Sequence, residues 1–85
     1  MTQYMVIETF NPGSKEAVYA RFAEKGRMLP MGLHYIDSWL AKEGDRCFQL
    51  METDNYALFA DWMEKWTDLG RFEIVEIGPK PVKET

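Results

Sequence analysis

The chain has 85 residues, a formal net charge of −4 at pH 7, and a hydrophobic fraction of 46%. This length suits one domain, and the apolar content excludes a disordered chain. The acidic balance and the absence of a basic run argue against a nucleic-acid partner. A single cysteine excludes an internal disulfide and a zinc site made of cysteines alone, so we expect neither a metal nor another cofactor.

No stretch of the sequence is long and apolar enough to cross a bilayer. The first ten residues, MTQYMVIETF, lack the charged leader and the long apolar core of a signal peptide. We therefore expect a cytoplasmic protein with no membrane partner.

The first predicted strand is Tyr4–Phe10, YMVIETF, which carries apolar residues on both alternating sides and is interrupted by Glu8. Such a pattern is typical of a strand that is covered on both faces. A turn, Asn11-Pro12-Gly13, then leads into a predicted helix over Lys15–Lys25. Gly26 suits the left-handed conformation that often ends a helix.

Two strands, Leu33–Leu40 and Arg46–Thr53, are predicted to form a hairpin. With Lys42-Glu43-Gly44 as a three-residue loop, the glycine would close the turn as a bulge. That register places one set on the helix side of the sheet: Ile36, Leu40, Phe48 and Leu50. It places a second set on the side away from the helices: Tyr35, Asp37, Trp39, Cys47 and Gln49. A loop of two or four residues would change these sets, and the register remains open.

The strongest periodic pattern lies in Tyr56–Leu69, where apolar residues recur at spacings of three and four, as in a helix. A last strand is predicted over Phe72–Ile77. The order strand, helix, strand, strand, helix, strand predicts an α+β, ferredoxin-like βαββαβ fold with two helices on one face of a four-stranded antiparallel sheet. Residues 1–78 would form the domain, and residues 79–85 a short C-terminal tail.

Helices cover one side of such a sheet, yet in this chain both sides carry apolar residues. A large exposed apolar patch is unusual for a soluble monomer. A second copy that packs its sheet against the first would cover it, so we expect a homodimer through the face away from the helices.

Nearly the whole chain, about residues 4–77, resembles a known family. The resemblance rests on these segments: YMVIETF, VYARFAEKGRMLP, GLHYIDSWL, CFQLMETD, LFADWMEKW and FEIVEI. It points to a small uncharacterised bacterial domain family of the dimeric α/β-barrel superfamily. That resemblance implies a dimer with a cavity between sheet and helices or within the barrel. The family has no assigned reaction, so no catalytic residue is carried over to this chain.

Glu8 and Asp37 are the candidate catalytic carboxylates, because a carboxylate in a shielded space has a raised pKa and can move protons near neutrality. Tyr35, Trp39 and Gln49 would bind the ligand, with the two rings stacking on it. The alternative is a purely structural pair of Asp37 with Gln49 that holds the strand register.

His34 could act as a haem ligand or a base, or could form an ion pair with Glu52 opposite it. Cys47 is expected to be a small buried apolar side chain without thiolate reactivity. Trp62 and Trp66, one helical turn apart, suit the core better than a ligand stack. Arg21 and Arg27 could gather an anion or face solvent.

Two classes of function remain open from the sequence. One is a homodimeric binding or interaction module that takes a small apolar or aromatic ligand. The other is a cofactor-free monooxygenase or isomerase that acts on an aromatic or enolic molecule. The fold alone cannot distinguish them, because function depends on the site.

Overall fold

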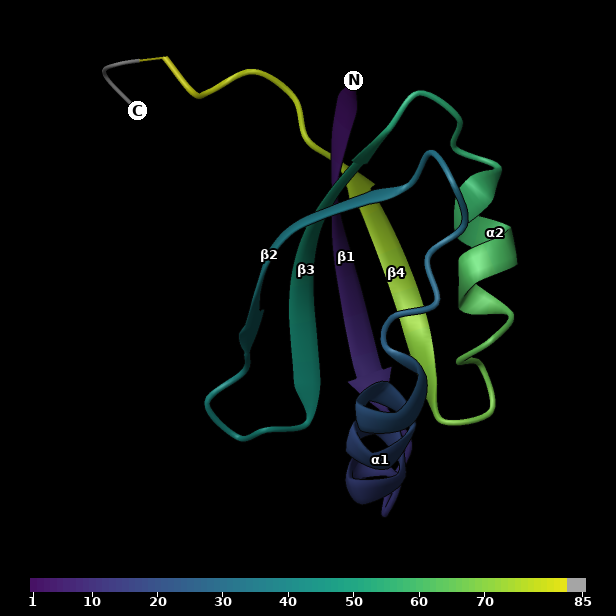
Figure 1. Cartoon of the computed structure of the whole chain (residues 1–85). Coiled ribbons are helices and arrows are strands. Elements are labelled where there is room, and N and C mark those ends of the chain that lie inside the picture. Colours follow the sequence, from purple (N-terminus) through teal and green to yellow (C-terminus); the bar gives the residue numbers. More distant parts are fainter. Residues whose placement is uncertain (83–85) are drawn as a thin grey trace.

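The structure is a computed structural model that describes residues 1–82, and Figure 1 shows its arrangement. Its elements in order are β1 (Thr2–Phe10), α1 (Lys15–Lys25), β2 (His34–Leu40), β3 (Arg46–Thr53), α2 (Leu58–Met63) and β4 (Gly70–Glu76). The strands pair in the order β2-β3-β1-β4, and every pair is antiparallel. This confirms the predicted ferredoxin-like α+β fold.

The core lies between the sheet and the two helices, because strand alternation directs one set of β1 side chains toward them. Tyr4, Val6 and Phe10 are buried on this side, and Glu8 lies between them. Val18 is contributed by α1, and the other buried apolar residues come from the connectors, β3 and the helical region: Leu33, Met51, Phe59, Trp62 and Trp66.

The predicted first helix has the observed bounds of α1, and the chain leaves it at Gly26, whose φ is 67°. The second helix is shorter than predicted. Regular α-helix covers only Leu58–Met63, and turns continue from it to Leu69 through hydrogen bonds such as that from the Leu69 amide to the Trp66 carbonyl. These bonds span three residues, which is the tighter winding common at helix ends. The apolar spacing of three and four residues therefore continues beyond the C-terminal end of the α-helix.

The predicted hairpin register is wrong near the turn and correct at the open end. The loop has four residues between Ala41 and Arg46, and it is closed by the hydrogen bond from the Ala41 amide to the Arg46 carbonyl. Each β2 residue near the loop therefore pairs one position away from the predicted partner. A bulge at Ile36 then restores the predicted pairs of His34 with Glu52 and Tyr35 with Met51.

The register of β3 against β1 decides which side chains face the helices. Cys47 pairs with Glu8, and Gln49 pairs with Val6, so both β3 residues lie on the helix side with the β1 core. The prediction that Cys47, Gln49 and Tyr35 face away from the helices is therefore wrong. Phe48, Leu50 and Ile36, which were expected in the core, are absent from the buried apolar cluster, and Leu40 alone of that set lines the helix side.

Within residues 1–82, no helix covers the opposite face of the sheet. Its inner rows pair Met5 with Leu50 and Ile7 with Phe48, and all four side chains are only partly buried. Trp39 on β2 is the direct partner of Phe48 on β3, and 50% of its surface is exposed. We call this surface, made of Met5, Ile7, Trp39, Phe48, Leu50 and Val75, the outer face.

Residues 79–82 of the predicted tail have no helix or strand and are exposed. The rest of that tail, residues 83–85, lies outside the described residues. Among the helices of residues 1–82, none reaches the length and apolar character needed to traverse a bilayer.

Gly70 provides a test of the close packing at the start of β4. It is buried and pairs with Phe10, and a Cβ at this position would lie 2.7 Å from the Thr9 carbonyl oxygen. We expect Gly70→Ala to lower the free energy of unfolding by about 2 kcal/mol, since the obstacle is backbone. Gly78→Ala is the matched control, because its Cβ would have open space. Urea denaturation of both variants measures the difference, and equal stabilities would contradict this packing.

Candidate functional site

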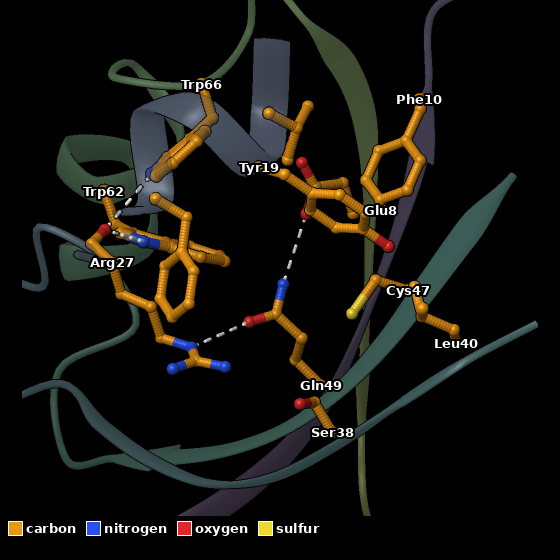
Figure 2. A pocket seen from close by; sticks show the side chains of 12 residues that line it. Glu8, Phe10, Tyr19, Arg27, Ser38, Leu40, Cys47, Gln49, Trp62 and Trp66 are labelled. Carbon is orange, nitrogen blue, oxygen red and sulfur yellow. Dashed lines mark hydrogen bonds between the residues drawn. The ribbon is translucent and has the colours of Figure 1, made fainter. Parts of the chain in front are cut away.

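A cavity of about 190 Å³ lies between the sheet and the helices (Figure 2). Its lining residues come from both layers: Glu8, Phe10, Val18, Tyr19, Phe22, Arg27, Ser38, Leu40, Cys47, Gln49, Trp62 and Trp66. Five of them are aromatic, and Glu8 and Arg27 are the only charged ones. An apolar hollow with a few convergent polar groups is the usual form of a small-molecule site.

The cavity exists because α1 does not fill the space over the hairpin. Val18 is the only buried residue of α1, and Tyr19 and Phe22 are each 43% exposed although they belong to its apolar side. Arg21 instead links α1 to the turns that follow α2. Both of its terminal nitrogens bond the carboxylate of Asp68 at 2.8 Å. The aromatic side of α1 is thus held at the rim of the hollow.

Glu8 is the buried carboxyl of this site, with only 5% of the residue exposed. Its Oε1 accepts a hydrogen bond of 3.3 Å from the side-chain amide of Gln49. Its Oε2 is buried and has no hydrogen-bond partner within residues 1–82. Burial disfavours the ionised form, which raises the pKa of Glu8 to about 7. Glu8 can therefore exchange a proton near neutral pH.

Gln49 connects Glu8 to Arg27 across the cavity (Figure 2). The Nε of Arg27 donates a long hydrogen bond of 3.5 Å to Oε1 of Gln49. The guanidinium carbon lies 3.5 Å from the ring centre of Tyr35 and 4.9 Å from that of Phe22. Aromatic faces attract a guanidinium and restrict its movement.

The backbone of Arg27 is fixed as firmly as its side chain. Its carbonyl oxygen accepts hydrogen bonds from the indole nitrogens of Trp62 and Trp66, at 2.9 Å and 3.1 Å. The next residue, Met28, adopts a φ of 59°, which is uncommon for a residue other than glycine. Trp62 and Trp66 are core residues, as predicted, and they also position the segment that supplies Arg27.

Cys47 points its sulfur toward the same space (Figure 2). Burial and the nearby Glu8 raise the pKa of its thiol, although Arg27 acts in the opposite direction. The thiol is therefore protonated at neutral pH and is a poor nucleophile. On β2, the hydroxyl groups of Tyr35 and Ser38 share a hydrogen bond of 2.5 Å.

The structure divides the predicted site residues between the two sides of the sheet. Glu8 and Gln49 line the cavity, and Tyr35 stacks on Arg27 beside it. The remaining candidates, Asp37, Trp39 and His34, are exposed and do not line the cavity. They therefore do not share the cavity that holds Glu8 and Gln49, and their roles stay predictions.

The predicted pair of Asp37 with Gln49 is also wrong. Asp37 accepts a hydrogen bond from the amide of Ser38 at 2.8 Å. The side chain of Gln49 bonds Glu8 and Arg27 instead. His34 pairs in register with Glu52 on the outer side of the hairpin and does not line the cavity. Within residues 1–82, no group of three or more His, Cys, Asp or Glu side chains could hold a metal ion.

Sequence reasoning considered Arg27 only as one of two arginines that could gather an anion or face solvent, and it did not identify Tyr19 and Phe22 as site residues. The connector RMLPMG did carry a signal, because two methionines and a leucine are too apolar for a bare surface loop. A connector that packs onto the core brings its flanking arginine with it. Tyr19 and Phe22 lie on the side of α1 that lines the cavity, and nothing in the sequence showed that this side lies over a hollow.

The burial of Glu8 predicts a specific dependence of stability on pH. The folded pKa of about 7 lies above the unfolded value of about 4.5, so the folded state binds the proton more tightly. Its contribution is therefore most favourable below pH 4.5 and is lost as the pH rises to about 7. We expect Glu8→Gln to stabilise the protein by on the order of 3 kcal/mol at pH 8 and by less than about 1 kcal/mol at pH 5, since one pKa unit corresponds to about 1.4 kcal/mol. Urea denaturation at both pH values tests this, and the same effect at both would contradict it.

Comparison with known proteins gives a family but no function. Among curated proteins, none matches the chain significantly. Residues 2–77 match a family described as a domain of unknown function (DUF3303), and this match covers every helix and strand found in residues 1–82. The chain therefore belongs to the DUF3303 family.

Proposed function

We propose that this protein binds a small planar molecule, aromatic or enolic, in the cavity between the sheet and the helices. The observation that carries the proposal is the buried Oε2 of Glu8, which has no partner within the described chain. A buried acceptor without a hydrogen bond costs on the order of 1–3 kcal/mol, so a ligand that bonds it would relieve a penalty already present.

The walls of the cavity support a planar ligand. Phe10 and Tyr19 meet edge to face, with ring centres 6.4 Å apart, and Trp62 and Trp66 lie at another part of the lining. Aromatic side chains favour stacked or edge-on contacts with other rings. A volume of about 190 Å³ suits a molecule with one or two rings better than a large cofactor.

A second candidate is catalysis of proton transfer on such a molecule, and the raised pKa of Glu8 favours it. The carboxylate would take the proton of a bound phenol or enol, which leaves a phenolate or an enolate in the cavity. Returning the proton at another atom gives an isomer. Reaction of the enolate with dioxygen would be the start of cofactor-free oxygenation. The structure supports Glu8, and not Asp37, for this role.

Phenol is a suitable probe for the binding proposal. We expect it to shift the indole N–H signals of Trp62 and Trp66 in a two-dimensional ¹H–¹⁵N spectrum, because both residues line the cavity. The signal of Trp39 serves as an internal control, since its ring lies on the outer face. Cys47→Met, which narrows the cavity, should weaken the effect at least threefold, and Cys47→Ala should retain it.

Shifts confined to Trp39, or equal affinities of the two Cys47 variants, would contradict binding in the cavity. A separate experiment, native mass spectrometry of the protein from its own host, identifies a ligand that co-purifies. If that ligand is converted by the wild type but not by Glu8→Gln, the protein is an enzyme. If both proteins bind it unchanged, it is a binding module.

We further propose that the outer face contacts a second copy of the chain in a homodimer. Two apolar pairs, Met5 with Leu50 and Ile7 with Phe48, form its centre, and Trp39 and Val75 extend it over both edge strands. An apolar surface that crosses all four strands is large for a soluble monomer. A symmetric contact of this face with itself would bury it in a second copy.

Sedimentation at micromolar concentration tests the homodimer. We expect a mass twice that of the chain for the wild type. Trp39→Lys should give a single chain, because a charge at an exposed aromatic position would be buried in the contact. Ala23→Lys, which adds the same charge on the exposed side of α1, should remain dimeric. A wild-type mass equal to one chain would rule out the dimer.

A further inference from the structure

We infer that the ligand of the cavity is a small aromatic or enolic acid whose carboxylate binds the guanidinium of Arg27. This inference rests on the proposed binding function and adds the charge of the ligand and the residue that recognises it.

Arg27 has no acidic partner in the described chain. The contrast with Arg21 is direct, because Arg21 forms a two-pronged ion pair with Asp68. The side chain of Arg27 makes one hydrogen bond, from Nε to the neutral amide of Gln49. Within residues 1–82, its two terminal nitrogens have no hydrogen-bond acceptor. A guanidinium offers five N–H donors in a planar fork that matches a carboxylate, so most of this capacity is unused.

The free donors of Arg27 are held in a defined position. The ring contacts with Tyr35 and Phe22 restrain the guanidinium, and the indoles of Trp62 and Trp66 hold the backbone carbonyl. An arginine on a bare surface would lose considerable side-chain entropy when it binds an anion. The fold already restricts the side chain of Arg27, so binding an anion costs it less conformational entropy.

The cavity itself leaves the positive charge of Arg27 uncompensated. Glu8 is the only other charged residue of the lining, and it is separated from Arg27 by the side-chain amide of Gln49. Glu8 is largely desolvated and therefore favours its neutral form. An anion at Arg27 would add the missing charge, while the buried carboxyl of Glu8 would bond a hydroxyl or carbonyl oxygen at the other end of the ligand.

This arrangement defines a ligand with three parts. A planar ring or conjugated chain would contact the aromatic walls, a carboxylate would bind Arg27, and a second oxygen would bond Glu8. Such a molecule satisfies both free polar groups of the cavity at once. A neutral aromatic molecule would leave Arg27 without a partner and would bind less tightly.

A pair of probes that differ only in charge tests the inference. We expect 4-hydroxybenzoate to bind the wild type at least tenfold more tightly than 4-hydroxybenzamide, since hydrogen bonds between charged groups are the strong ones. Titrations followed by the indole signals of Trp62 and Trp66 give both affinities. Arg27→Gln should remove the preference, and Arg27→Lys should retain part of it.

Arg71→Gln is the matched control, because Arg71 is exposed on β4 and lies outside the cavity. It should keep the full preference for the acid. Indole signals as well dispersed as those of the wild type will show that each free variant is folded. If the amide binds in the cavity as tightly as the acid, or if Arg27→Gln keeps the preference, the inference is wrong and the binding proposal stands. If neither probe nor phenol shifts the cavity signals, both are wrong.

Discussion

The position of Glu8 in β1 is the constraint on which the site depends. Strand alternation directs Glu8 to the same side as Tyr4, Val6 and Phe10, so the carboxyl enters the core together with the largest apolar surface of the strand. β1 lies between β3 and β4, and its register is fixed on both sides. A shift by one residue would expose Glu8 but would also move the apolar set out of the core. The fold therefore accepts a buried carboxyl as the cost of burying its neighbours.

The surroundings of Glu8 compensate for that cost only in part. Gln49 lies diagonally across from it on β3, two residues beyond its direct partner Cys47, where its amide can reach one carboxyl oxygen. Arg27 lies on the far side of that amide and has no direct bond to Glu8. A direct ion pair would have lowered the pKa of the carboxyl, whereas the intervening amide leaves it raised. The site thus keeps one proton-exchanging group and one cation apart inside a shared hollow.

The elements of this fold were predictable because their signals are local. The bounds of α1 and β3 follow from apolar periodicity and from the glycines and polar residues that flank them. The faces of the hairpin were not predictable, because they depend on whether the loop has three or four residues. Gly44 adopts the positive φ expected of the turn under either count, so it could not distinguish them. The bulge at Ile36 then shifts the register by one residue, so the pairs at the open end of the hairpin are the same for either loop length.

A purely structural account of Glu8 and Gln49 explains less than a functional one. The pair could serve to hold β1 against β3, but the apolar alternation of both strands already fixes that register. A structural pair would also be expected to satisfy both carboxyl oxygens, and within residues 1–82 Oε2 has no partner. A well-packed apolar residue at position 8 would avoid the desolvation cost and would fill part of the hollow. The buried carboxyl, the open space beside it and the restrained Arg27, which has no acidic partner within residues 1–82, are the three features that the proposed ligand would contact together.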